Sequence, residues 1–113
     1  MSQNEIEQVE LSIEAAQEMV ARGRAAERLA LVPEFKRLVL DGYFRDEAAR
    51  LAHLLSDPNI SEEIRAHVNR DLLGLGAFKR YLHVLVQLGH RAENEIEEAR
   101  DALEEMRAEE GAE

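Results

Sequence analysis

The most constraining feature of this sequence is a long apolar stripe in its C-terminal half. Apolar or small residues recur there at intervals of three or four, at Ile64, Val68, Leu72, Leu75, Phe78, Leu82, Leu85, Gly89, Ala92, Ile96, Ala99, Leu103 and Met106. This spacing places them along one side of an α-helix, as in a coiled-coil heptad repeat. We therefore predict one helix over residues 61–110, which would be about 75 Å long. Because that exceeds the width of a compact domain of this size, the helix must pair with another helix or join other copies.

A second stripe predicts the partner helix near the N-terminus. Its members lie three or four residues apart, at Ile6, Val9, Ile13, Ala16 and Val20, and Gly23 continues it. Proline disfavours helix at the residue before it, so Pro33 should end this helix near Leu31. Ser2 or Asn4 is a candidate N-cap. The predicted helix covers residues 1–31.

Two short helices are predicted between the stripes. Pro33 suits the first turn of a helix over 33–41, and Gly42 would stop it as a left-handed residue. Asp46 would then cap a helix over 46–55, and Ser56-Asp57-Pro58-Asn59 would form a turn. Ser61 is the expected cap of the long helix. No segment has the pattern of a strand, so the chain is predicted to be a single all-α domain over 1–113, with 111–113 as a flexible end.

The simplest arrangement of these helices is an arm and a head. The first helix would lie antiparallel to the second half of the long helix as a coiled-coil-like arm, and the two short helices would cover its first half as a compact head. The expected helix-interface residues are Ile6, Val9, Ile13, Val20, Leu85, Ile96, Leu103 and Met106. Heptad stripes serve pairing within one chain and between chains, so both remain open, and a homo-oligomer is expected.

Charge is distributed unevenly along the chain. The 113 residues carry 24 Asp and Glu against 14 Lys and Arg, for a net charge of −10. Residues 1–20 contribute −5, residues 93–113 contribute −8, and residues 21–92 contribute +3. The acidic ends are either a solvated surface or a binding surface for a basic partner. Repulsion from phosphates argues against duplex nucleic acid as the main partner.

No residue pattern of an active site or a cofactor site is present. The chain has no Cys, which excludes disulfides and thiolate metal sites. His83 and His90 are too far apart for one metal ion, and the glycines around Leu75 lack a phosphate-binding motif. We therefore expect no catalytic residue, no cofactor and no metal. The polar N-terminus is unlike a signal peptide, and no apolar run reaches the ~20 residues that cross a bilayer, so a soluble protein without its own export signal is expected.

The predicted head mixes basic and aromatic residues. Such a surface suits a protein partner or single-stranded nucleic acid, although neighbouring carboxylates weaken the case for nucleic acid. The alternative is a solvated surface with internal ion pairs. The candidate partner surface consists of Phe35, Arg37, Tyr43, Phe44, Arg45 and Arg50.

The segment PEFKRLVLDGYFRDEAARL, residues 33–51, resembles a group of small all-helical proteins of tailed bacteriophages, often encoded beside genes for virion parts. The likeness covers roughly residues 25–110 and includes the acidic run near 104–110. It implies a non-enzymatic role in virion structure or assembly, with capsid, portal or tail proteins as partners and the virion or host cytoplasm as location. No catalytic residue is carried over by it. The alternative is a small acidic phage inhibitor that binds a basic site on a host protein.

Overall fold

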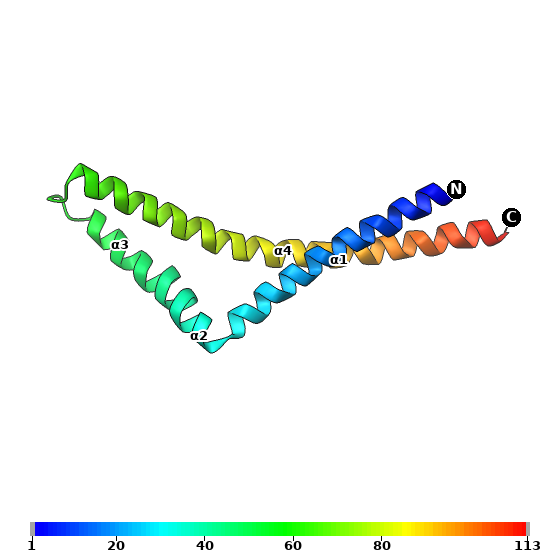
Figure 1. The fold of residues 1–113 in the computed structure, drawn as a ribbon, viewed down its shortest axis with the longest axis horizontal. Coiled ribbons are helices and arrows are strands. Elements are labelled where there is room, and N and C mark those ends of the chain that lie inside the picture. The colour runs from blue at the N-terminus through cyan, green and yellow to red at the C-terminus, as the bar shows by residue number, and fades with distance from the viewer. Residues whose placement is uncertain (1, 113) are drawn as a thin grey trace. The chain divides into compact units, whose positions relative to one another are not determined.

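The computed structural model describes residues 2–112, which form helices and short connections with no strand among them. The elements in order are α1 (Gln3–Leu31), α2 (Pro33–Phe35), the π-helix η1 (Lys36–Glu47), α3 (Ala48–Leu55) and α4 (Glu62–Ala112) (Figure 1). The all-α prediction is confirmed, and so is the pairing of the long C-terminal helix with the N-terminal helix. Within the described residues, no helix combines the length and apolarity that a bilayer span requires.

The chain divides into two compact units. We call Met1–Ala26 with Leu85–Glu113 the arm, and Glu27–Val84 the head. In the arm, the blue half of α1 lies beside the orange and red half of α4, and the two run antiparallel (Figure 1). α4 continues through Gly111 to Ala112, and Glu113 lies outside the described residues, so the flexible end at 111–113 stays a prediction.

The ends of α1 and α4 follow local rules of helix capping. The Ser2 hydroxyl accepts a hydrogen bond from the backbone N–H of Glu5 at 3.3 Å. At the other end of α1, Val32 is extended, with φ −70° and ψ 119°, and Pro33 opens the next helix. The Ser61 hydroxyl accepts from the backbone N–H of Ile64 at 3.2 Å, as expected of an N-cap.

The predicted break at Gly42 is wrong. Residues 33–55 are continuously helical, and no described glycine has a positive φ. Gly42 instead lies inside the π-helix, where a Cβ at this position would come within 2.9 Å of the Arg37 carbonyl oxygen five residues back. The residue therefore permits the wide π turn, and does not end a helix. Asp46 caps nothing, because helicity continues through it, and its carboxylate pairs with Arg45.

The core of the arm is small and is made by α1 and α4. Ala16, Val20, Ala92 and Ile96 form one buried cluster, with Ile13 and Met19 packed against it. The two backbones come very close beside this cluster, since a Cβ at Gly23 would lie 2.9 Å from the Cα of Gly89 and 2.8 Å from the Leu85 carbonyl oxygen. Both helices therefore need glycine at this crossing.

The core of the head combines η1, α3 and the first part of α4. Its most buried side chains are Phe44, Leu51, Val68 and Leu75. The rings of Phe44 and Phe78 lie 5.4 Å apart between centroids, a tilted aromatic contact. Two positions expected to face inward are exposed: Ile64, at 51%, lies in the first turn of α4, and Phe78, at 39%, covers Phe44 at the edge of the core.

An arginine of α4 fixes the connection between α3 and α4. The Arg65 guanidinium donates to the Leu55 carbonyl at 3.1 Å and to the Asp57 carbonyl at 3.4 Å. Carbonyls at a helix C-terminus have no partner within the helix, and a side-chain donor satisfies them. The turn itself is closed by the Asp57 carboxylate, which accepts from the backbone N–H of Asn59 at 2.9 Å.

Candidate interaction surfaces

The expected helix-interface residues all lie within the arm. Ile6, Val20, Ile96 and Leu103 are buried, whereas Val9, Ile13, Leu85 and Met106 are half-buried. α1 and α4 of one chain thus cover most of this apolar surface themselves. Little of the stripe is left for a second chain.

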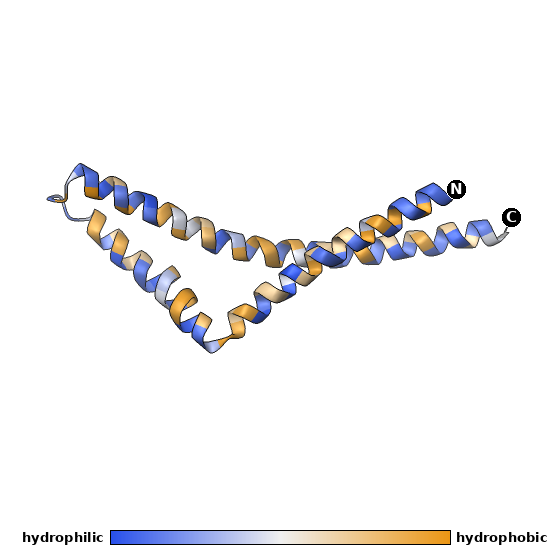
Figure 2. Ribbon diagram, in the orientation of Figure 1, coloured by the Kyte–Doolittle hydropathy of each residue, from blue (hydrophilic) through white to orange (hydrophobic). Residues whose placement is uncertain are grey.

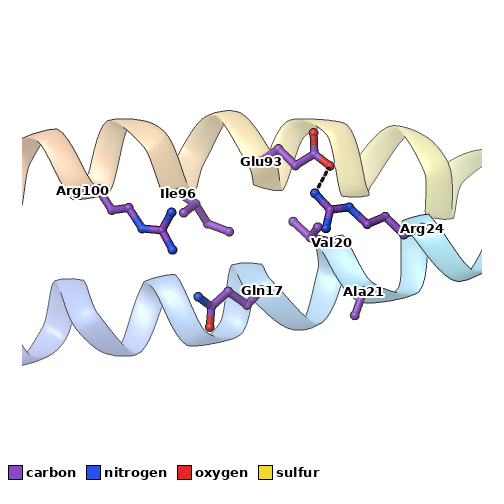
Figure 3. Close-up of a pocket in the computed structure, with 7 residues that line it drawn as sticks. All are labelled: Gln17, Val20, Ala21, Arg24, Glu93, Ile96 and Arg100. Atoms are coloured by element: carbon purple, nitrogen blue, oxygen red, sulfur yellow. Dashed lines mark hydrogen bonds and ion pairs between the residues drawn. The ribbon is translucent and has the colours of Figure 1, made fainter.

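Salt bridges join the two helices of the arm along one flank. Arg24 Nη2 lies 3.3 Å from Glu93 Oε1, and Arg107 Nη2 lies 2.8 Å from Glu10 Oε1. Between these pairs is an open groove of about 430 Å³, lined by Gln17, Val20, Ala21, Arg24, Glu93, Ile96 and Arg100 (Figure 3). Exposed pairs of this kind contribute at most about 1 kcal/mol each.

The entire net charge of the chain resides in the arm. Its sequence holds 15 carboxylate side chains and five arginines, for −10, whereas the head holds nine acidic and nine basic side chains. A second arm would therefore be repelled electrostatically. The head offers no such barrier to close approach.

The candidate partner surface of the head is only partly accessible. Phe44 is 8% exposed, so its inclusion is wrong: η1 turns its ring onto Phe78. Phe35 is half-buried, and Tyr43 and Arg37 are exposed. The structure thus does not gather the six residues into one accessible surface.

The two remaining arginines of that surface are engaged in local ion pairs. Arg45 donates to Asp46 at 2.9 Å and also lies 3.8 Å from Asp41, and the hydrogen bond to Asp46 raises the Arg45 pKa. Arg50 binds Glu47, which raises the Arg50 pKa and lowers the Glu47 pKa. Arg45 and Arg50 thus form the internal ion pairs that the sequence analysis gave as the alternative to a partner surface.

Exposed apolar side chains are concentrated in the head. Eleven large apolar side chains are exposed among the described residues, and all but Leu11 belong to the head. In Figure 2, orange residues recur along both helical segments of the head. The ten residues are Leu29, Leu31, Val32, Leu38, Tyr43, Ile64, Leu73, Phe78, Tyr81 and Val84.

Four apolar residues of the head share one exposed side of α4, which sequence reasoning missed. Leu73, Ala77, Tyr81 and Val84 are spaced by four, four and three residues, and Leu73 is 74% exposed. Residues at these intervals lie on one face of a helix. We call these four residues the back face. The signal was present in the sequence as a second stripe, out of phase with the one through Leu75.

Two glycines beside the back face have no packing role in the chain. A Cβ at Gly74 or Gly76 would meet nothing within 4 Å. Glycine inside a helix is less favourable than alanine by about 1 kcal/mol. In contrast to Gly23, Gly42 and Gly89, these two positions have no neighbouring backbone that requires them.

Histidine and carboxylate side chains are the candidate metal ligands of the described residues. They include no group of three or more His, Cys, Asp or Glu side chains that could hold a metal ion. His67 Nε2 lies 3.9 Å from Asp71 Oδ2, one turn further along α4. Comparison with protein-family models, curated proteins and solved structures finds no match to this chain.

Proposed function

We propose that this chain is a non-enzymatic assembly protein that acts by self-association and by binding other proteins through its helices. Following the resemblance of residues 33–51, its setting would be a bacteriophage particle, and its partners would be capsid, portal or tail components. The arm forms a closed helix pair, and the head provides the binding surface.

The concentration of exposed apolar side chains in the head is the observation that carries this proposal. Contiguous exposed apolar surface is typical of protein–protein interfaces, whereas single exposed apolar residues are ordinary. Leu31, Leu38 and Leu73 are 81%, 64% and 74% exposed in the single chain. The head is also electrically neutral, so copies or partners can approach it closely.

Quantitative mass spectrometry of particles from a phage that encodes this sequence tests the proposal. We expect the protein in purified particles or in assembly intermediates, at a fixed copy number relative to the major capsid protein. Its absence from both would contradict a structural or assembly role. Purified protein should also show a mass that rises with concentration.

A second candidate is an inhibitor that binds a basic site on a host protein. The observation in its favour is the restriction of the whole −10 charge to the arm. An acidic helical surface can compete with nucleic acid for a basic site, and such binding falls steeply as salt is added. Capture of a host nucleic-acid-binding protein by the purified chain at low salt, with release at high salt, would support this candidate. Retention at high salt would favour apolar binding through the head.

A further inference from the structure

Leu11 is the one large apolar residue of the arm that is exposed among the described residues. It is 63% exposed and lies on the side of α1 that faces away from α4. Glu7, Glu14 and Glu18 share this side, at −4, +3 and +7 from Leu11. Arg22 pairs with Glu18 at 3.2 Å, so Glu7 and Glu14 provide the uncompensated negative charge. We call these four residues the outer face of α1. It has the character of a single apolar anchor among carboxylates.

The back face of the head has the opposite character. Arg70 and Arg80 lie on the same side of α4 as Leu73, at −3 and +7, and both are exposed. Neither arginine forms an ion pair or hydrogen bond with any residue that the structure describes. The back face therefore presents an apolar stripe flanked by two uncompensated positive charges.

We propose that the outer face of α1 in one copy binds the back face of α4 in a second copy. This inference rests on the self-association proposed above and names the surfaces that produce it. Leu11 would insert beside Leu73, Ala77 and Tyr81, while the glutamates would meet Arg70 and Arg80. Gly74 and Gly76, which have open space around them, would let the incoming helix approach the α4 backbone.

Charge favours the pairing of an outer face with a back face over the pairing of two back faces or of two outer faces. Two back faces would bring the arginines of both copies together, and two outer faces would bring the glutamates together. Like charges opposed across an interface disfavour it, whereas opposite charges fix its orientation. The contact is therefore between two different surfaces. Two copies that make this contact reciprocally form a closed dimer, whereas a contact made once per pair leaves one face of each copy free and propagates into rings or open filaments.

Two blocking variants test the proposal by complementation. Leu11→Arg disables the outer face and leaves the back face intact, whereas Leu73→Glu does the reverse. Size-exclusion chromatography with light scattering should show wild-type masses that increase with concentration to twice 12.8 kDa or more. Each variant alone should remain at 12.8 kDa, and an equimolar mixture should form a one-to-one complex and nothing larger.

A matched control and a second pair of variants complete the design. Ala52→Glu introduces the same charge at an exposed alanine of α3, outside both faces and outside the exposed apolar side chains of the head, and should associate like the wild type. Far-UV circular dichroism checks that every variant keeps its helicity. If a charged variant loses helicity, Leu11→Ala and Leu73→Ala replace the pair and should each weaken association at least tenfold.

The outcomes separate this inference from the broader proposal. If the wild type associates but the Leu11 variant associates equally well, or the two variants fail to complement, the pairing of these faces is overturned and self-association stands. If Leu73→Glu abolishes association while Leu11→Arg keeps it, the interface is head to head and the inference is again wrong. A wild type that stays monomeric at every concentration would overturn both the inference and the proposed self-association.

Discussion

The arm and the head are both helical and share α4, yet they differ in what each leaves exposed. The arm buries its apolar stripe between α1 and α4 and carries the full net charge of −10. The head is neutral and exposes ten large apolar side chains. Apolar surface left in water is what another chain can cover, whereas a charged surface keeps copies apart. The two units therefore differ in the kind of surface that they offer to another chain, apolar in the head and charged in the arm.

The glycines of the two units make the same contrast on a smaller scale. Gly23 and Gly89 of the arm are in backbone contact, which explains why neither can carry a side chain. Gly74 and Gly76 of the head face open space. Gly23 and Gly89 are thus required by packing within the chain, whereas Gly74 and Gly76 are not.

The largest expected difference in the free energy of unfolding is between alanine variants of two leucines of α4, one in each unit. Leu103→Ala should lower the free energy of unfolding by about 2–5 kcal/mol, because Leu103 is 5% exposed and truncation leaves a cavity. Leu73→Ala should change it by no more than about 0.5 kcal/mol, because Leu73 is already in water. Urea unfolding followed by circular dichroism measures both. Equal losses would mean that Leu73 is as buried as Leu103, and would contradict the exposed back face.

Alanine at two glycines should have effects of opposite sign. Gly23→Ala should destabilise the protein by about 1–3 kcal/mol, because the new methyl group would push α1 away from the Gly89 backbone. Gly76→Ala should stabilise the monomer by about 1 kcal/mol, because helix propensity improves and nothing is displaced. Thermal unfolding at low protein concentration compares them. A stabilising Gly23→Ala would show that the close crossing in the arm does not exist.

Removal of the Arg65 side chain tests how the head is closed. Arg65→Ala should cost about 1 kcal/mol, because the Leu55 and Asp57 carbonyls lose their donor. Arg70→Ala is the matched control, since Arg70 is exposed on the same helix, and its effect should stay within about 0.5 kcal/mol. Tyrosine fluorescence follows the head selectively, because both tyrosines lie there. Equal free energies of unfolding for the two variants would show that Arg65 does not stabilise the turn.

The smallest expected effect is a pH dependence confined to the head. The hydrogen bond from Arg50 lowers the pKa of Glu47 below its ordinary value of 4.5, so the folded state favours the ionised carboxyl. This stabilisation is complete above the pKa of the unfolded chain and disappears as the pH falls through the lower folded value. The difference in Tm between wild type and Glu47→Gln should therefore be constant near neutral pH and shrink below about 4.5. A difference that grows on acidification would have the wrong sign for this pair.

Features set by neighbouring residues along the chain could be predicted from the sequence. Pro33 ended α1 at Leu31, and Ser61 capped α4, because each effect acts within one helical turn. The apolar stripes also predicted which sides of α1 and α4 meet. These inferences need only helical periodicity and side-chain size.

Features that depend on backbone geometry or distant groups could not be predicted. Gly42 is a common helix stop, but here the π-helix brings the Arg37 carbonyl against it and the helix continues. Arg65 reaches carbonyls eight and ten residues earlier, which no local motif encodes. The back face was not predicted, because its four residues form a weaker apolar stripe on the side of α4 opposite the dominant one.

The central claim, that other chains bind the head and leave the buried seam of the arm unchanged, is tested most directly by methyl NMR of the wild type over a dilution series. We expect the methyl signals of Leu73 and Val84 to shift with concentration, while those of Val20, Ile96 and Leu103 stay fixed. Shifts at the three seam residues with none at Leu73 and Val84 would show that association occurs by exchange of arm helices, and would contradict the account.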